Sequence, residues 1–486
     1  MSDSDTRDRP PVAGGGTLGV LALAAAAFAL AQTAVVPGLT DLTRALHTST
    51  ANVSWVLSGY LVSAAIFTPI MGRLGDMFGK RRMLIVSLVF FAGGSVLAAL
   101  SGDIWLLVAA RVVQGVSGGI FPLCFGIISD TFPEERRPGA LGLVSAIAGI
   151  GAGGGLLMGG LLIDHASWQW IFWVGAIMAA GAAAGALRVP ASEMRTPGRV
   201  DVPGALLLAV GLTGLLLALT KTAIWGWGDA RTLGLVGAGL VVLVLFGLYE
   251  RRAAEPLVNM SVFGRPAVLA TNVTTMLVGT GMFGAFVLIP QIAQTPKSSG
   301  YGFGTDATGA GLLLLPACLT MLVAGPLSGK LTLRFGPKVP LATGVLIAAI
   351  GLTALAPAHG SRGVVIALSM VVFAGIGLSM AAIPNLIVRA VPPEMTGQAT
   401  GVNALVRSIG SSIGSQVVAT LLAASVTVAH PIPTDGAFTQ AFWLGAGAAL
   451  LAAVAASLVP QRKARGDTAG EPAAALSPAA TRGPGA

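Results

Sequence analysis

Two arginines lie inside long apolar segments, where a charge could bind a ligand. Arg111 falls within residues 104–128, and Arg407 falls within residues 399–426. A cation at such a depth is costly and needs a partner, so each is a candidate for ligand binding. The structural alternative is that each guanidinium donates hydrogen bonds to helix ends or backbone carbonyls. The two residues occupy different halves of the chain, and both could face a central cavity.

No aspartate or glutamate falls in the middle of an apolar segment. The acids near the segment ends are Asp41, Asp103, Asp164, Asp229 and Asp306 on one side, and Asp76, Asp130, Glu250 and Glu255 on the other. Two deep cations without a deep acid favour neutral, zwitterionic or anionic ligands over cationic ones. If transport is coupled to protons, the group that binds the proton could then be a carboxylate near a segment end, such as Asp41 or Asp306.

Uncharged polar side chains within the segments are candidates to line the same cavity. They are Gln32, Thr33, Tyr60, Gln114, Asn272, Asn385 and Asn403, with Thr275 beside them. Each could equally form a hydrogen bond between two helices.

The composition shows what kind of elements position these residues. Hydrophobic residues make up 54% of the chain and charged residues only 10%, whereas soluble domains carry about a quarter charged residues. Apolar stretches of about twenty residues are long enough to cross a bilayer as helices. We predict fourteen of them, at residues 17–38, 52–72, 82–101, 104–128, 138–163, 167–188, 203–222, 231–250, 267–290, 308–330, 338–358, 362–386, 399–426 and 437–459.

The basic residues predict the orientation of these spans. If both termini are cytoplasmic, most of the 29 lysines and arginines fall in inner loops and tails, as the positive-inside rule requires. The eight tryptophans then lie near the outer ends of spans, where indoles prefer the membrane interface. The net charge of +9 therefore reflects topology and attraction to anionic lipid, and we expect no nucleic-acid partner.

Several chemistries have no support in the sequence. Both cysteines lie within predicted spans, so a disulfide scaffold is not expected. The histidines (His47, His165, His359 and His430) are expected in outer loops, solvated and without metal-ligand spacing; an external pH sensor is the alternative. Residues 302–311 are rich in glycine but lack the Gly-Lys-Ser/Thr of a P-loop. We therefore expect no metal, no cofactor, no use of ATP and no enzymatic activity.

One short run of glycines and charges joins the second and third spans. It contains Gly72, Asp76, Gly79, Lys80 and Arg81. The run resembles the loop between spans two and three of the major facilitator superfamily, whose pattern is G-x-L-x-D-x-x-G-[RK]-[RK]. The resemblance implies that these five residues form an inner gate between two bundles.

The run is repeated in the second half of the chain. Residues 329–338 echo it, with Leu333 in place of the acid, and residues 392–394 echo residues 132–134. Such a repeat is typical of the two parallel halves of this superfamily. The seventh and eighth spans would then be an insertion between the halves, followed by a short interfacial helix within residues 251–266.

Other motifs are closest to the fourteen-span drug:proton antiporter branch. Residues 111–115 resemble R-x-x-Q-G, and residues 167–172 resemble the W-x-W-x-F that opens span six. The branch also carries a D-x-T in span one, but residues 31–33 read Ala-Gln-Thr here. Proton coupling is therefore the part of the resemblance with the least support.

The fifth span carries glycines in an antiporter-like pattern. Gly151, Gly155 and Gly159 recur every four residues, and Gly160 follows, which allows close helix approach. The pattern resembles G-x-x-x-G-P-x-x-G-G, with Leu156 in the place of the proline, so the kink that proline gives could be missing. The resemblance implies a sliding surface between conformational states; generic tight packing is the alternative.

We therefore expect an all-α polytopic protein of the major facilitator fold, with fourteen transmembrane helices in a 6 + 2 + 6 order and cytoplasmic termini. The expected units are a disordered tail (1–16), a six-helix bundle (17–188), the inserted helices and interfacial segment (189–266), a second six-helix bundle (267–459) and a disordered tail (460–486).

The resemblance implies a monomeric exporter in the plasma membrane. It would move hydrophobic or amphipathic drugs or secondary metabolites by alternating access, driven by proton antiport. A uniporter or metabolite exchanger of the same fold is the alternative, favoured by the missing span-one acid. A membrane sensor or scaffold would require a soluble signalling domain, for which the tails are too short.

Overall fold

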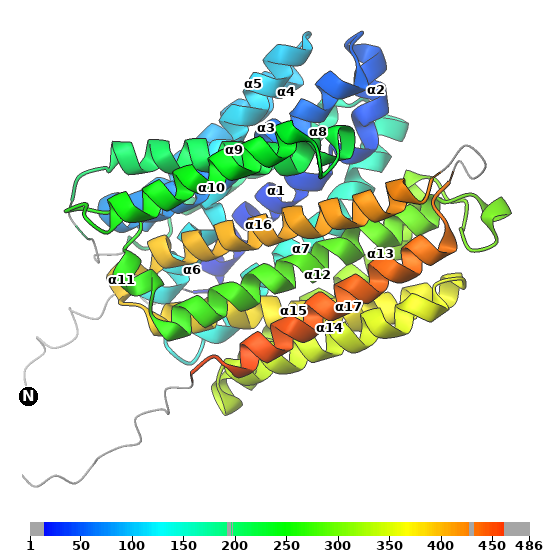
Figure 1. Cartoon of the computed structure of the whole chain (residues 1–486). Helices are drawn as coiled ribbons and strands as arrows, with labels where there is room; N and C mark the ends of the chain where they lie inside the picture. Colours follow the sequence, from blue (N-terminus) through cyan, green and yellow to red (C-terminus); the bar gives the residue numbers. More distant parts are fainter. Residues whose placement is uncertain (1–13, 192–195, 197, 427–431, 461–486) are drawn as a thin grey trace, which may run out of the picture.

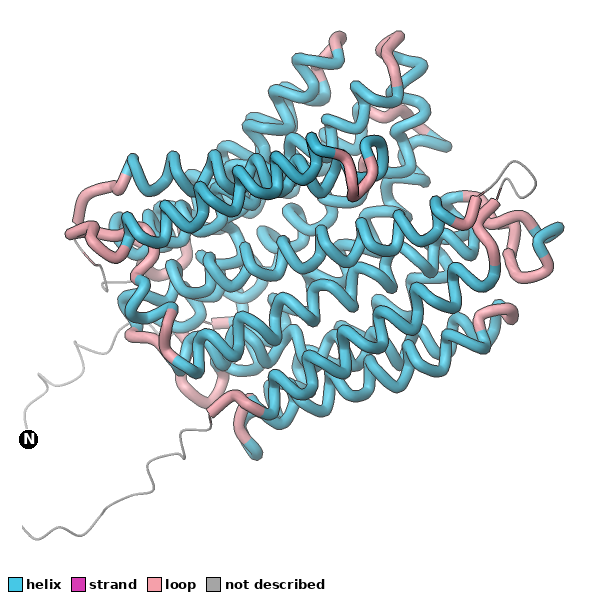
Figure 2. The backbone as a smooth tube through the Cα atoms, viewed as in Figure 1, coloured by secondary structure: helices cyan, strands magenta, loops and turns pink. Residues whose placement is uncertain are grey.

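The computed structural model describes residues 14–191, 196, 198–426 and 432–460. Within these residues the chain consists of helices and loops (Figures 1 and 2). Most of both predicted tails falls outside the described residues.

The helices follow the predicted spans closely. Their bounds are α1 Gly15–Thr33, α2 Leu39–Ala45, α3 Thr50–Phe78, α4 Lys80–Ala99, α5 Ile104–Gly115, α6 Ile120–Thr131, α7 Arg137–His165, α8 Gln169–Ala186, α9 Val202–Trp225, α10 Ala230–Glu250, α11 Met260–Phe263, α12 Pro266–Gln294, α13 Ala307–Phe335, α14 Lys338–Ala358, α15 Arg362–Ala390, α16 Thr396–Ala424 and α17 Asp435–Ser457. The short α2 and α11 are too short to cross a membrane.

Thirteen helical segments of the described chain are long and apolar enough to span a membrane, and α7 makes fourteen. The fourth of these, Ile104–Thr131, combines α5, a 3₁₀ turn at Val116–Gly119, and α6. The fourteen-helix prediction from the sequence is therefore confirmed.

Helix α7 is bent although it contains no proline at the expected position. Its two parts, Arg137–Gly151 and Gly153–His165, meet at an angle of 41°. Glycine runs are a known cause of sharp bends, and residues 151–155 contain four glycines beside Ala152. The bend therefore does not require the proline that Leu156 replaces.

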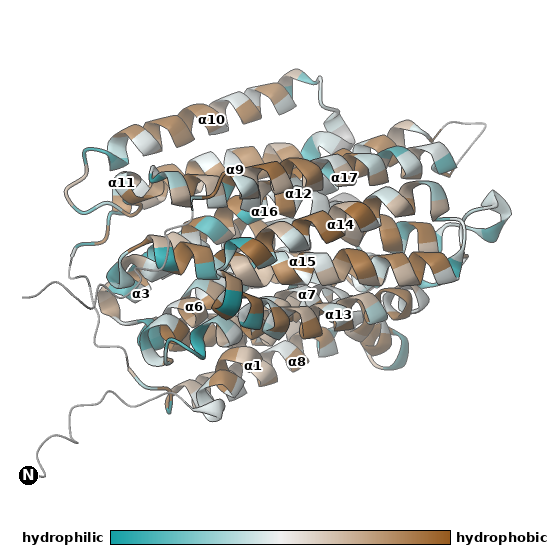
Figure 3. Ribbon diagram, turned by 90° about the horizontal axis from the view of Figure 1, so that it is seen from below, coloured by the Kyte–Doolittle hydropathy of each residue, from teal (hydrophilic) through white to brown (hydrophobic). Residues whose placement is uncertain are grey.

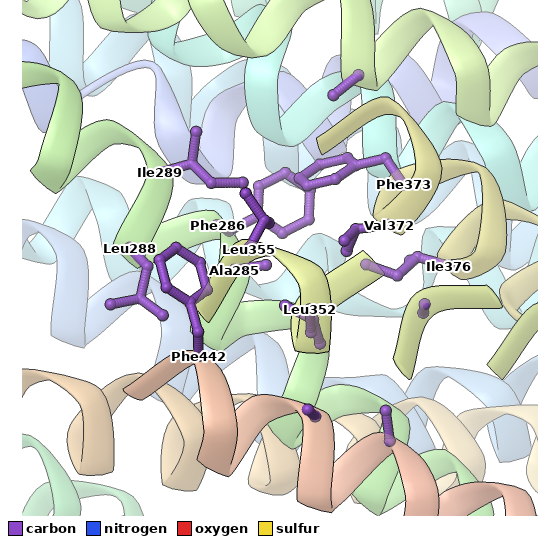
Figure 4. Close-up of a cluster of buried hydrophobic side chains, with 14 of the residues drawn as sticks. Ala285, Phe286, Leu288, Ile289, Leu352, Leu355, Val372, Phe373, Ile376 and Phe442 are labelled. Carbon is purple, nitrogen blue, oxygen red and sulfur yellow. The ribbon is translucent and has the colours of Figure 1, made fainter. Parts of the chain in front are cut away.

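Two groups of helices each enclose an apolar core. Helices α1, α3, α4, α6, α7 and α8 surround the first core, and α12 to α17 surround the second. In the second core, Phe286 packs edge-on against Phe373, with ring centroids 4.6 Å apart (Figure 4). Because lipid tails are as apolar as this core, the packing of such side chains stabilises the group through van der Waals contact.

The inserted helix α9 packs along the seam between the two groups, and α10 packs against α9. Leu208 and Leu212 of α9 join one apolar cluster with Ala65 of α3 and Leu405 of α16. Helix α10 lies at the edge of the molecule and is apolar along its length (Figure 3), with Val241 and other large side chains exposed. An apolar surface of this extent is suited to contact with lipid.

Aspartates at the predicted outer ends cap the helices that follow them. Asp103, Asp229 and Asp306 each accept hydrogen bonds from backbone N–H groups in the first turn of α5, α10 and α13. Side-chain oxygens at this position satisfy N–H groups that have no partner within the helix. These carboxylates therefore have a structural use at the helix ends.

Candidate functional site

The two helix groups are joined at the inner end, meaning the end that the charge distribution predicts to be cytoplasmic. Asp76 of α3 accepts hydrogen bonds from the backbone N–H groups of Gly397 (3.1 Å) and Gln398 (2.7 Å) at the start of α16. A carboxylate at a helix N-terminus also interacts favourably with the helix dipole. This contact joins the first half of the chain to the second.

Lys80 balances two carboxylates within the first half. Its Nζ lies 2.8 Å from Asp130 of α6 and 3.4 Å from Asp76, and all three side chains are at most 1% exposed. With the usual charges, the group carries a net charge of −1. The other oxygen of Asp130, Oδ1, is buried and accepts no hydrogen bond within the described residues. We call Asp76, Lys80, Asp130 and the first turn of α16 the inner latch.

The glycines of the predicted gate motif have separate roles. A side chain at Gly72 would collide with the backbone carbonyl of Gly397, so glycine lets α3 and α16 approach closely. Gly79 has φ of +98° between α3 and α4, a conformation that glycine adopts without strain. Arg81, by contrast, forms no hydrogen bond or ion pair with the described residues, so it is not part of the inner latch.

The linker on either side of the inserted helices also reaches the inner latch. The side-chain amide of Gln398 donates to the carbonyl of Leu257, and the N–H of Thr196 donates to the carbonyl of Asp76 at 2.8 Å. The sequence motif revealed Asp76 and Lys80 but not these partners or Asp130, because their proximity depends on how separate helices pack.

Arg111 is held entirely within the first half. Its guanidinium donates to the carbonyls of Val56 (3.0 Å) and Ala31 (3.3 Å) and to the side chain of Gln114. It also lies 4.1 Å from the ring centroid of Tyr60, within the range of a cation–π interaction. This arrangement connects α1, α3 and α5, as the structural alternative predicted.

Arg407 has different surroundings. It lines a cavity of about 30 Å³ between the two halves, together with residues of α6, α7, α15 and α16. The cavity has room for roughly two water molecules. Phe121, Phe125 and Met380 form apolar walls, and Asn403 adds an amide. The guanidinium of Arg407 forms no hydrogen bond, ion pair or ring contact with any other described residue.

Most of the other predicted cavity residues bond to neighbouring helices. Tyr60 donates to the carbonyl of Phe28 and Gln114 donates to Ser95, both on neighbouring helices, whereas Asn385 donates to the carbonyl of Ala381 within its own helix, α15. Thr33 donates to the carbonyl of Gly151 at 3.1 Å, and Gln32 lies beside it, half-buried.

Asn403 both bonds to a neighbouring helix and lines the cavity beside Arg407. Its amide donates to Asn272 at 2.8 Å and to Thr275 at 2.9 Å in α12, and the residue also lines the cavity beside Arg407. Of the predicted polar residues, it is the one that this cavity includes.

The glycines of α7 form two packing faces. Gly151, Gly155 and Gly159 contact α1, so closely that a Cβ at any of them would collide with that helix. Gly160 instead faces Thr308 of α13, and Gly149 and Gly153 face the same helix. The predicted glycine row therefore packs within the first half, and a different row of α7 forms the contact between halves.

One prediction about histidine was wrong. His359 is 3% exposed rather than solvated. Its Nε2 lies 2.8 Å from a carboxylate oxygen of Asp435 at the start of α17, and its Nδ1 lies 2.9 Å from the carbonyl of Ala356. The prediction failed because α14 and α17 pack together at this end and enclose the ring.

Two helical halves joined at one end, with a charged cavity between them and fourteen apolar spans, define a polytopic membrane transporter. No group of three or more metal-ligating side chains occurs among the described residues. The sequence matches the Major Facilitator Superfamily in two overlapping regions, residues 21–415 and 271–483. The chain belongs to this superfamily, among its drug-efflux members.

The relatives that support this placement are resistance and export proteins. The tetracenomycin C resistance and export protein of Streptomyces glaucescens is 32% identical over 85% of this chain and 77% of its own length. The multidrug resistance protein Stp of Mycobacterium tuberculosis is 30% identical over 79% of this chain and 72% of its own.

A solved structure shares the fold. The proton:xylose symporter of this superfamily, solved with 6-bromo-6-deoxy-D-glucose, superposes with a TM-score of 0.63 at 16% identity, covering 92% of this chain and 95% of that one.

Proposed function

We infer that this protein exports drugs or small secondary metabolites across the plasma membrane by alternating access. The observation that carries the proposal is the guanidinium of Arg407, which has no partner among the described residues and lies in a cavity between the two halves. A buried cation without a protein partner is costly, and a bound substrate would reduce this cost in each cycle. The names of the related export proteins agree with this direction of transport.

At about 30 Å³ the cavity is too small for a drug-sized molecule in this conformation. We propose that separation of the two halves widens it for amphipathic substrates with an acidic or strongly dipolar oxygen. Phe121, Phe125 and Met380 would contact an apolar or aromatic body, while Arg407 would donate hydrogen bonds to an oxygen. Arginine donates in a fork that matches a carboxylate well. The described residues supply no acid to this cavity, so a cationic substrate would meet repulsion there.

The inner latch is our proposed site of proton coupling. Lys80 leaves one negative charge uncompensated between Asp76 and Asp130, and the buried Oδ1 of Asp130 has no hydrogen-bond donor. Binding one proton would neutralise the group. The sequence suggested Asp41 and Asp306, near the ends of spans, as proton-binding carboxylates. In the structure Asp306 caps α13, and Asp41 lies 3.8 Å from Arg44.

A uniporter of the same fold is the second candidate. It is favoured by the lack of a carboxylate in the middle of any described span, where related antiporters carry one in span one.

Proteoliposomes with an internal pH dye distinguish these functions. The probes are a labelled aromatic carboxylate and its methyl ester, under an imposed pH gradient, with protein-free liposomes as a control. Antiport predicts proton movement that requires both protein and probe, and the Asp130→Asn variant would transport with little proton movement. If the probe crosses while the pH remains constant, the protein is a uniporter.

The same vesicles test the role of Arg407. We expect Arg407→Gln to lower carboxylate transport about tenfold or more and to affect the ester much less, while Arg407→Lys retains part of the activity. An equal loss for both probes would show that Arg407 does not recognise the acidic oxygen.

A further inference from the structure

A second and larger cavity lies at the inner end of the second half, away from the cavity of Arg407. Its volume is about 880 Å³. The ends of α12, α13, α14 and α15 and the residues after α17 surround it, close to where α17 ends in Figure 1. Among the residues that the structure describes, four bases and no acid line the cavity: Arg265, Arg334, Lys338 and Arg389.

These four bases have no carboxylate partner among the described residues. Arg265 donates to the carbonyl of Ala390 at 3.2 Å, and Lys338 donates to the carbonyl of Ser457 at 2.6 Å. Arg334 lies 5.1 Å from the ring centroid of Phe335. Neutral carbonyls and rings do not cancel the positive charge, so the cavity attracts anions.

A buried hydroxyl adds a second, independent observation. Thr332 lines the cavity and is 1% exposed, and its Oγ1 has no hydrogen-bond partner within the described chain. A buried polar group without a partner is energetically costly. A ligand with an acceptor oxygen in the cavity would satisfy it.

The repeat in the sequence explains why the cavity is open and positive. In the first half, Lys80 fills the corresponding place and is neutralised by Asp76 and Asp130. When residues 72–80 are aligned with residues 329–337, Lys80 corresponds to Pro337 and Asp76 to Leu333. At these two positions the second half therefore has neither a lysine nor an acid.

The rim of the cavity indicates the kind of anion. Leu333 and Phe335 line it and are 52% and 50% exposed, at the end of a membrane-spanning helix. A soluble anion gains nothing from these apolar side chains, whereas the acyl chains of a lipid can contact them. Basic pockets between transmembrane helices on the cytoplasmic side are suited to anionic headgroups.

We propose that this cavity binds the phosphate of an anionic phospholipid from the inner leaflet. The phosphate lies among the four bases and accepts a hydrogen bond from Thr332, and the acyl chains extend past Leu333 and Phe335. The site is separate from the substrate cavity, and the proposal does not depend on the proposed function.

The test uses the full-length protein in detergent, with lipid binding measured by native mass spectrometry and thermal unfolding. The probes are phosphatidylglycerol, phosphatidylcholine and inorganic phosphate. The cavity variant is Arg334→Gln with Arg389→Gln, both exposed residues. The matched control is Arg251→Gln with Arg252→Gln, which removes the same charge from exposed positions at the same end but outside the cavity.

We expect phosphatidylglycerol to bind the native protein and raise its Tm, with little effect from the other two probes. The cavity variant should bind phosphatidylglycerol about 30-fold more weakly, at roughly 1 kcal/mol for each base, and the control should bind it within about twofold of the native protein. Thr332→Val should weaken binding several-fold with the fold retained.

Three results would overturn the proposal. Equal losses in the cavity variant and the control would show only diffuse attraction to the basic surface. Equal protection by inorganic phosphate would mean that the acyl chains make no contribution. Native-like phosphatidylglycerol binding by the cavity variant would place the bound lipid outside the cavity.

Discussion

The carboxylate of Asp76 accepts a hydrogen bond of 2.7 Å from the backbone N–H of Gln398, which lies 322 residues further along the chain. This bond joins α3 of the first half to the start of α16 in the second half. It acts together with the close approach of Gly72 to Gly397 to hold the two halves together at the inner end.

Replacing Asp76 should open the inner end. Asp76→Asn keeps one acceptor oxygen but loses the charge and one hydrogen bond, at a cost of about 1.5–3 kcal/mol. The inner-closed population should then fall roughly tenfold or more relative to the open one. Spin labels at Phe78→Cys and Glu394→Cys, both exposed, should show a longer distance component. Glu134→Gln, an exposed change of equal charge, should leave the distances unchanged.

Replacing Lys80 should destabilise the first half. Lys80→Met leaves Asp76 and Asp130 buried without a cation, which typically costs about 3–5 kcal/mol. Thermal unfolding should show a much lower Tm than for Arg81→Met, whose side chain is only half-buried. Adding Asp130→Asn to Lys80→Met should recover part of the loss. Additive effects of the two changes would contradict a direct pairing of Lys80 with Asp130.

The two deep arginines should differ in their effects on stability. Arg111→Gln leaves the carbonyls of Val56 and Ala31 without their donor, at about 1–3 kcal/mol for each. Arg407→Gln removes no hydrogen bond to a described residue and removes a costly buried charge, so its unfolding temperature should equal or exceed that of the native protein. A large loss of Tm in Arg407→Gln would show that this residue is also structural.

Substitution by alanine should change stability in different ways at two helical glycines, Gly159 and Gly93. A Cβ at Gly159 would collide with the backbone of α1 at Ala34, whereas one at Gly93 would meet nothing within 4 Å. Gly159→Ala should therefore cost about 1–3 kcal/mol through overpacking. Gly93→Ala should be neutral or slightly stabilising, because alanine has the higher helix propensity. Equal unfolding temperatures would mean that α1 and α7 can separate at little cost.

Local patterns predicted much of this protein. Fourteen apolar segments of about twenty residues indicated the spans, because a bilayer requires apolar helices of that length. The glycines and charges around Asp76 and Lys80 indicated an inner gate, and the echo at residues 329–338 indicated two related halves. Each of these signals lies within a short stretch of sequence.

Relations between distant segments could not be predicted in the same way. Arg111 and Arg407 are equivalent in the sequence as single cations in apolar spans, yet one is fully partnered and the other is not. His359 looked like a loop residue, but the start of α17 covers it. The bend in α7 also appeared without its proline.

The sequence alone thus determined the membrane-spanning character, the number of helices and the family, since these depend on composition, periodicity and short motifs. Only the tertiary structure decided which charges are paired. The partner of a buried charge is whichever group the packing of separate helices brings within about 3 Å, and a single sequence does not encode that distance locally. The partners of Arg111, the free guanidinium of Arg407 and the acid-free cavity around Thr332 all depend on that packing.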